Sequence, residues 1–145
     1  MEHTSFASSV LDAPIERVWA YFDDFNGLPA FNPGILESRL EEGSARTVGA
    51  VRYLTLPDGF VREKLLKFEP ADFELEYSIL DSSMPVRDYI AGVRLTPVTD
   101  SGKTFVQWWA DYTTEGVDLR QFAPVITEQV FAAGLRTLGE RLRNG

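Results

Sequence analysis

The stretch RDYIAGVRLTPVTDSGKTFVQWWADYTT, residues 87–114, determines the fold because two strand-like segments flank one turn in it. Directly opposed residues of a hairpin share a face. A turn at Asp100-Ser101 would place four opposed pairs on one face: Leu95 with Val106, Val93 with Trp108, Ala91 with Ala110, and Tyr89 with Tyr112. All of these residues are apolar or aromatic, whereas the other face is mixed and includes Arg94, Gln107 and Asp111. The pattern predicts an antiparallel hairpin with one buried face.

The same two-residue period occurs in earlier parts of the chain. Turn signals such as Pro57-Asp58-Gly59 separate the segments. Together with 87–96 and 103–114, the predicted strands cover residues 5–12, 35–41, 47–56, 61–68 and 73–81. Strands spaced this closely favour antiparallel pairing. Directing Tyr77 inward, and keeping Glu74 and Glu76 out of the interior, requires a bulge or an odd-length turn near Pro70.

Two segments have helical periodicity instead. After the first strand, Pro14 precedes a stripe with i, i+3, i+4 and i+7 spacing: Ile15, Val18, Trp19 and Phe22. From about Asp118 to Arg143, one face carries Phe131, Leu135, Leu138 and Leu142. Asp118 suits the N-cap, and Pro124 should kink or delay this helix. The predicted fold class is α+β, with a helical segment after strand 1 and a long C-terminal helix.

The inner face of the sheet needs an apolar cover, and only the C-terminal helix is long enough to supply it. Small residues lie at the predicted contact, with Ala91 and Ala110 on the sheet and Gly134 on the helix. We therefore expect unfilled space there, which would make a ligand pocket. The predicted ligand-binding residues are Leu54, Leu65, Tyr77, Ala91, Val93, Trp108, Ala110, Tyr112, Phe131 and Leu135.

Arg52 and Glu63 are the candidate polar residues of this pocket. A turn centred between Asp58 and Gly59 would oppose Leu54 to Glu63 and Arg52 to Leu65. Arg52 and Glu63 would then be diagonal neighbours on one face, within reach of each other. A neighbouring arginine is expected to keep Glu63 ionised. The pair could bind or act on a ligand, or it could be an internal ion pair that only stabilises the strand register.

Composition limits the remaining possibilities. The chain has 145 residues, of which 44% are hydrophobic, and we expect one globular domain, residues 1–145. A net charge of -8 argues against nucleic acid as the main partner. There is no secretory signal at the start and no apolar run long enough for a membrane span, so a cytoplasmic location is the expectation. With no cysteine, one histidine and no glycine-rich phosphate loop, we expect neither a metal nor another cofactor.

A series of motifs along nearly the whole chain resembles the polyketide cyclase/dehydrase branch of the START and birch-pollen-allergen-like superfamily. The motifs are APIERVW (13–19), DF (24–25), Leu28, FNP (31–33), VGAVR (48–52), REKLL (62–66), YSIL (77–80) and MPVRDY (84–89). This resemblance implies the helix-grip fold, in which a seven-stranded antiparallel sheet wraps around a long C-terminal helix. Members of the superfamily bind lipids, sterols, hormones, quinones and polyketides, and a minority catalyse cyclisation, dehydration or isomerisation.

Within this branch, residues 49–89 look most like plant lachrymatory-factor synthase. There an arginine, a glutamate and a tyrosine in the cavity are implicated in rearranging a small sulfenic acid. By motif they correspond to Arg52 in VRY, Glu63 in REKLL and Tyr89 in PVRDY. The resemblance thus implies that these three residues are catalytic or binding residues. Tyr89 could equally be a core tyrosine that is hydrogen-bonded to the backbone.

Three functions are compatible with these observations. The first is binding of a small apolar or polyketide-like molecule whose polar group meets Arg52 and Glu63. The second is a cofactor-independent cyclase, dehydratase or isomerase with Glu63 as acid or base and Arg52 as anion anchor. The third is a regulatory domain that engages another protein, and a patch around Trp109 on the outer face would favour it. Pairing with a second copy as a homodimer is compatible with each of them.

Overall fold

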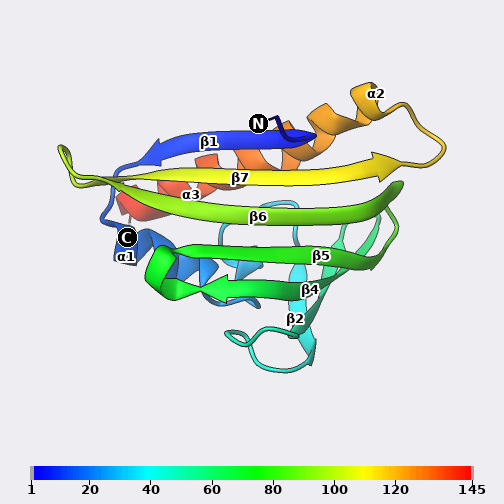
Figure 1. Cartoon of the computed structure of the whole chain (residues 1–145), viewed down its shortest axis with the longest axis horizontal. Helices are drawn as coiled ribbons and strands as arrows, with labels where there is room; N and C mark the ends of the chain where they lie inside the picture. The colour runs from blue at the N-terminus through cyan, green and yellow to red at the C-terminus, as the bar shows by residue number, and fades with distance from the viewer. Residues whose placement is uncertain (1, 145) are drawn as a thin grey trace.

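Seven antiparallel strands form one curved sheet with the order β1-β7-β6-β5-β4-β3-β2 in the computed structural model, which describes residues 2–144 (Figure 1). The strands are β1 (Ser5–Leu11), β2 (Glu37–Glu42), β3 (Val51–Leu56), β4 (Gly59–Glu69), β5 (Glu74–Ser82), β6 (Val86–Val98) and β7 (Lys103–Thr114). Each strand from β2 to β6 pairs with the next strand along the chain. β1 pairs with β7 and forms one edge of the sheet, and β2 forms the other. The predicted α+β class and the antiparallel seven-stranded sheet are confirmed.

The helices cover one face of this sheet, behind the strands in the view of Figure 1. They are α1 (Ile15–Phe22), the 3-10 turn η1 (Leu28–Ala30), α2 (Leu119–Pro124), the π-helix η3 (Val125–Ala132) and α3 (Ala133–Asn144). Both predicted apolar stripes are buried, from Ile15 to Phe22 in α1 and from Phe131 to Leu142 in the C-terminal helix. Pro124 directly precedes the π-helix, so the helix is disturbed where the missing N–H of proline predicts it.

The β6–β7 hairpin has the predicted register over most of its length. Leu95 pairs with Val106, Val93 with Trp108 and Ala91 with Ala110. Toward the far end the register shifts between Arg87 and Ile90, which makes a bulge at Asp88 and Tyr89. The rings of Tyr89 and Tyr112 still stack, with their centroids 5.1 Å apart. The hairpin's inner face is therefore the apolar one.

The predicted register of the β3–β4 hairpin is wrong by two residues. Leu56 pairs with Gly59, so Pro57 and Asp58 alone form the turn, and Arg52 lies directly opposite Glu63 instead of diagonal to it. β4 begins at Gly59. A Cβ atom at this position would lie 2.0 Å from Oγ of Ser83, so the close approach requires glycine. A shift of two residues preserves the face to which each side chain points. Arg52 and Glu63 consequently share the inner face, as predicted.

The irregularity expected near Pro70 is present before β5. A 3-10 turn, η2 (Pro70–Asp72), leads into Phe73, which adopts a left-handed conformation with φ of 52°. The β4–β5 ladder also shifts between Leu65 and Lys67. Tyr77 is directed into the core as a result.

The space expected beside Gly134 is filled. A Cβ atom on Gly134 would lie 3.2 Å from Cζ3 of Trp108, and the ring of Trp108 stacks on Phe131 at a centroid distance of 4.7 Å. The prediction of a gap at Ala91, Ala110 and Gly134 is therefore wrong. Gly134 makes room for the Trp108 indole, which occupies the space that the small residues were expected to leave empty.

We predict that Asp118→Ala lowers the free energy of unfolding by about 1 kcal/mol, a typical value for loss of an N-cap. The carboxylate of Asp118 accepts a hydrogen bond of 2.8 Å from the backbone N–H of Arg120 at the start of α2. Urea denaturation would measure the change. Asp100→Ala, in the exposed β6–β7 turn, is the control and should be close to neutral. Equal effects of the two substitutions would contradict the capping role.

Candidate functional site

Two small cavities lie between the sheet and the helices. The larger, of about 60 Å³, is lined by Leu28, Ile35, Leu54, Leu56, Val61, Glu63, Tyr77, Met84, Tyr89, Trp108, Ile126 and Val130. The smaller, of about 20 Å³, is lined by Tyr21, Phe22, Asp24, Phe25, Leu28, Phe31, Arg52, Leu75, Tyr77, Val93 and Trp108. Leu28, Tyr77 and Trp108 belong to both walls, so they separate the two spaces. We call the larger space the inner cavity.

Arg52 and Glu63 are the only buried charged residues among residues 2–144, at 5% and 6% exposed. Arg52 donates from Nε to Oε1 of Glu63 (2.8 Å) and from Nη1 to the carbonyl oxygen of Phe25 (2.8 Å). Its Nη2 lies 2.6 Å from the same Oε1 and completes the ion pair. Its guanidinium carbon lies 3.8 Å from the ring centroid of Phe25 and 5.0 Å from that of Tyr77. These contacts hold the guanidinium in one orientation, as cation–π stacking favours.

Glu63 is held at only one of its two carboxylate oxygens. The hydrogen bond and the ion-pair contact from Arg52 both reach Oε1, and no donor within residues 2–144 is bonded to Oε2. Every fully enclosed polar side-chain atom of the described residues has a partner, so Oε2 must face open space, and Glu63 lines the inner cavity. Burial raises the pKa of Glu63 above its ordinary value, although Arg52 opposes the shift. Arg52 thus lowers the pKa of Glu63, as expected of a neighbouring arginine, but burial has the larger effect.

Tyrosine hydroxyl groups supply the other polar atoms of the site. The hydroxyl of Tyr89 has no hydrogen-bond partner within the described chain, although the residue is only 4% exposed and lines the inner cavity. The hydroxyl of Tyr77 accepts a bond of 3.1 Å from Nε1 of Trp108, which leaves its own proton available. Burial raises the pKa of both tyrosines, so both remain neutral donors near pH 7.

This arrangement can bind a polar group inside an apolar space. Oε2 of Glu63 can accept a proton or a hydrogen bond, and the hydroxyl of Tyr89 can donate one. The remaining wall of the inner cavity is mostly aliphatic, from residues such as Leu54, Val61 and Ile126. A small molecule with one hydroxyl or carbonyl group and an apolar body complements these features.

The predicted site residues fall into three groups. Glu63, Tyr89, Leu54, Tyr77 and Trp108 line the inner cavity, while Arg52 and Val93 line only the smaller one. The rest of the predicted set lies in the packed core and on neither wall: Leu65, Ala91, Ala110, Tyr112, Phe131 and Leu135. The hydroxyl of Tyr112 is engaged by Oγ of Ser5 at 2.6 Å.

The predicted set lacked Leu56 of β3 and Val61 of β4, as well as Met84 and several other residues from outside the sheet. Leu28, Ile35, Ile126 and Val130 come from loops and from the π-helix, where strand alternation has no meaning. Sequence analysis also assigned Tyr77 and Trp108 to the lining without anticipating the hydrogen bond between them. Met84 lies in the MPVRDY motif, so the family resemblance included this residue. The strand pattern did not predict that its side chain lines a cavity.

Within residues 2–144, no group of three histidine, aspartate or glutamate side chains is arranged to hold a metal ion. In the same part of the chain, no helix combines the length and the apolar character that crossing a membrane requires.

The sheet, the long helix and the enclosed polar cluster define a helix-grip protein with an interior site. A family model described as polyketide cyclase / dehydrase and lipid transport matches residues 3–143. The chain therefore belongs to this family. No curated protein matches the chain in a sequence comparison.

Solved structures with the same fold cover nearly the whole chain. The protein XoxI from Bacillus cereus is 27% identical, with 99% of this chain and 97% of that chain covered and a TM-score of 0.88. An uncharacterised protein from Bacillus thuringiensis is 26% identical, with 96% and 98% covered and a TM-score of 0.86. A protein from Thermobifida fusca is 26% identical, with 97% and 93% covered and a TM-score of 0.87. Their names specify no ligand.

We predict that Arg52→Met and Glu63→Leu each lower the free energy of unfolding by about 3–5 kcal/mol. Either change leaves the other charge buried without its partner, because both side chains are almost fully enclosed. The double variant should recover most of this loss, since apolar residues of similar volume often replace a buried ion pair without a penalty. Urea denaturation of the three variants tests this. A double variant no more stable than the single ones would show that the fold itself requires the pair.

Proposed function

We propose that this protein binds a small, largely apolar molecule in the inner cavity, with the polar group of the ligand at Glu63 and Tyr89. One observation carries the proposal: two buried residues, Glu63 and Tyr89, line the same apolar space, and neither Oε2 of Glu63 nor the hydroxyl of Tyr89 has a hydrogen-bond partner in the described chain. Family membership supports it, because the family description includes lipid transport.

Other buried polar side chains are hydrogen-bonded to groups within the protein. Tyr112 is bonded to Ser5, the indole N–H of Trp108 is bonded to Tyr77, and the hydroxyl of Thr104 donates to the carbonyl oxygen of Ala13 at 2.8 Å. A buried polar group without a partner costs about 1–3 kcal/mol. The hydroxyl of Tyr89 makes no such bond within the described chain, and this difference supports a role in contacting a ligand.

The size of the inner cavity limits what fits without rearrangement. At about 60 Å³ it has room for a few water molecules. Pockets for drug-sized ligands usually measure roughly 300–1,000 Å³. Either the ligand has only a few non-hydrogen atoms, or side chains of the wall move to admit it.

Proton transfer is the second candidate function, and the raised pKa of Glu63 favours it. A carboxyl group whose pKa is closer to neutrality exchanges protons more effectively at physiological pH. Oε2 could take a proton from carbon next to a carbonyl group while Tyr89 donates a hydrogen bond to the carbonyl oxygen. Arg52 would orient Glu63, because all three of its nitrogens already contact Glu63 or the carbonyl oxygen of Phe25 and it does not line the inner cavity.

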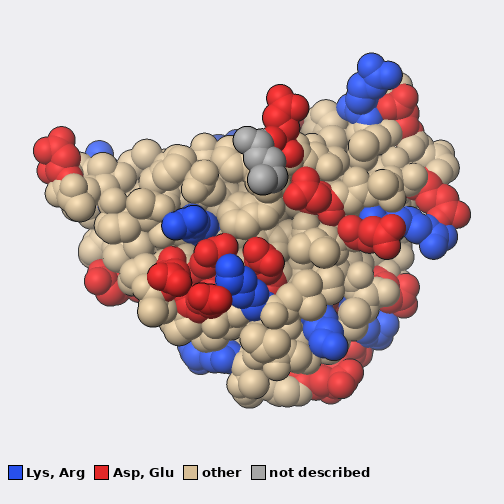
Figure 2. Space-filling view, viewed as in Figure 1, with Lys and Arg blue, Asp and Glu red and all other residues tan. Residues whose placement is uncertain are grey.

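A protein-binding role is the third candidate. Exposed apolar side chains on the outer face of the sheet are the feature that would support it. Phe6 and Ile90 are 39% and 48% exposed on either side of Trp109, which stacks against His3. Figure 2 shows acidic and basic side chains scattered over this face, with uncharged surface between them. A docking role would not explain a buried glutamate with a free oxygen. Ligand binding accounts for more of the observations.

We predict that Tyr89→Phe lowers the affinity for phenol roughly five- to tenfold while leaving the free energy of unfolding equal or higher. Phenol is the probe because it has an apolar ring and one hydroxyl group. The substitution removes a donor that the fold does not use. Calorimetric titration and urea denaturation would measure the two quantities.

Tyr112→Phe is the matched control on the neighbouring strand. It removes a hydroxyl engaged by Ser5, so it should cost about 1 kcal/mol of stability and leave phenol binding unchanged. Native mass spectrometry of the purified wild-type protein adds an independent test, as a retained apolar compound should be present and should be absent from Tyr89→Phe. A protein isolated empty and unable to bind phenol would refute the proposal.

We also predict that phenol affinity rises with pH as Glu63 ionises. A carboxylate accepts a stronger hydrogen bond than a carboxylic acid, and burial moves the pKa of Glu63 upward, so the rise should lie above the ordinary range of a glutamate. Titrations between pH 4 and 8, on the order of one unit apart, would follow it. Glu63→Gln should show no rise, whereas Glu76→Gln, on the outer side of β5, should behave like the wild type.

A further inference from the structure

The hairpin of β5 and β6 is open at the end that carries its turn. The ladder between these strands stops at Ser78 and Ile90, although β5 continues to Ser82 and β6 begins at Val86. This end lies at the right of Figure 1, where the connection between the two strands loops outward. The sheet is therefore split between residues 79–82 and 86–89.

A bulge in β6 accompanies the split. Asp88 has a φ of 53°, which residues with a Cβ atom seldom adopt and which aspartate tolerates better than most. The register of β6 against β7 shifts across this residue. Tyr89, the next residue, is directed inward to the inner cavity, while Asp88 remains exposed. The same distortion thus creates the opening and places the hydroxyl of Tyr89 behind it.

A surface hollow of about 650 Å³ occupies the split. It is lined by Ile79, Leu80, Asp81, Ser82, Met84, Pro85, Val86, Arg87, Asp88 and Glu115. Met84 is the one residue that also lines the inner cavity. Ile79, on the wall of the hollow, pairs directly with Glu63 on the wall of the cavity. The hollow and the inner cavity therefore lie on opposite sides of Met84.

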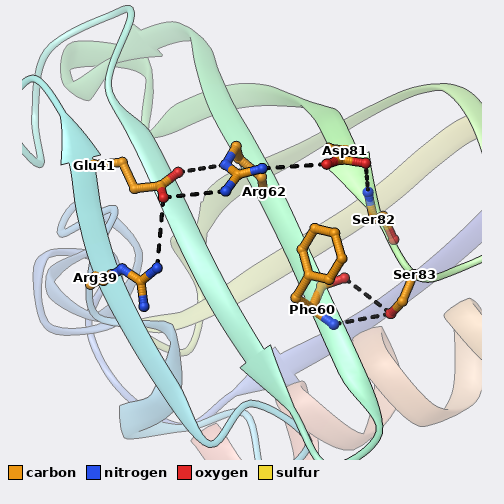
Figure 3. A network of polar contacts seen from close by, with 7 residues as sticks. All are labelled: Arg39, Glu41, Phe60, Arg62, Asp81, Ser82 and Ser83. Atoms are coloured by element: carbon orange, nitrogen blue, oxygen red, sulfur yellow. Dashed lines mark hydrogen bonds and ion pairs between the residues drawn. The ribbon is translucent and has the colours of Figure 1, made fainter.

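The backbone around Met84 is firmly held. Ser83 is bonded to Phe60 three times. Its N–H donates to the carbonyl oxygen of Phe60 (3.0 Å). Its Oγ donates to the same oxygen (3.2 Å) and accepts from the Phe60 N–H (3.0 Å), as Figure 3 shows. On the other side, the N–H of Glu115 donates to the carbonyl oxygen of Pro85 at 3.1 Å. On the outer face, Arg62 of β4 forms ion pairs with Glu41 of β2 and with Asp81 of β5 (Figure 3). These ion pairs connect the strands next to the loop that carries Met84.

The Met84 side chain, in contrast, has no such restraint. It is unbranched and apolar, and methionine adapts its three torsions to irregular spaces. A rotation of this side chain would join the two spaces without moving the backbone. Resting on the proposed binding function, we propose that Met84 is the gate through which small molecules reach Glu63 and Tyr89, and that its side chain limits the size of the ligand.

The opposite side of the inner cavity is closed by the segment between α1 and β2. Asn32 in this segment is buried, accepts a hydrogen bond from the N–H of Gly34 (3.1 Å) and donates from Nδ2 to the carbonyl oxygen of Val130 (3.4 Å). Ile35 lines the inner cavity from this side and does not line the hollow. A route past Ile35 would require this loop to separate from the helix, so Ile35 provides the matched control.

Xenon exchange tests the gate without relying on hydrogen bonds, since xenon enters apolar cavities. NMR of dissolved xenon would measure its exchange with the wild type, Met84→Ala and Ile35→Ala. Both substitutions remove side-chain atoms from the cavity wall, but only the first opens the split. We expect at least tenfold faster exchange in Met84→Ala and a change below twofold in Ile35→Ala. No acceleration in Met84→Ala, or equal acceleration in both variants, would overturn the gate.

The unmodified protein gives a second readout that does not depend on how a variant folds. The chain has two methionines, so carbon-13 labelling of their methyl groups yields two signals, and the one missing from Met84→Ala belongs to Met84. That signal should shift when xenon or phenol is added. A Met84 signal that stays unchanged while either probe binds would contradict the gate.

The size limit is tested with phenol and 4-propylphenol. The ratio of their affinities should move at least tenfold toward 4-propylphenol in Met84→Ala, whereas Leu80→Ala, which alters only the hollow, should leave it unchanged. An unchanged ratio in Met84→Ala would overturn the size limit.

If xenon passes Met84 but no phenol binds, the gate stands and the proposed function fails. If phenol binds with unaltered exchange in Met84→Ala, the function stands and the gate fails.

Discussion

Two opposite charges enclosed in one apolar interior constrain the rest of this structure. Removing a charge from water costs several kcal/mol, so each needs close partners. Arg52 has a complete set, with Glu63, the carbonyl oxygen of Phe25 and two aromatic rings. Glu63 has a partner at one oxygen only. Because the guanidinium is held so firmly, the free carboxylate oxygen has a defined position.

Aromatic packing decides how much space that oxygen faces. Trp108 occupies the centre of the interior, stacked on Phe131 and bonded to Tyr77. Small residues on the sheet and on α3 accommodate the indole, as the close approach to Gly134 shows. What remains is a narrow apolar space with polar atoms at one end. A site of this kind selects ligands by size before it selects them by hydrogen bonding.

The irregular parts of the structure gather around this space. The β4 ladder shifts between Arg62 and Glu63, β6 bulges at Asp88, and a π-helix follows Pro124. Bulges and π-helical turns are frequent beside functional sites, because they redirect side chains that a regular element would place elsewhere. Here they direct Glu63 and Tyr89 into one cavity and leave the β5–β6 hairpin open beside it. The same distortions therefore explain both the position of the polar groups and the split in the sheet.

The amino-acid sequence by itself determined the strand pattern, the inner face of the sheet and the placement of Arg52 and Glu63 side by side on that face. Alternation has a period of two, so even a register error of two residues preserved the face. Only the tertiary structure decided whether space remained inside and which polar atoms lacked partners. These properties depend on contacts between distant segments, such as Trp108 with Tyr77 and with Gly134. No local pattern encodes such contacts, because the volume and the hydrogen bonds at each position depend on side chains that arrive from elsewhere in the chain.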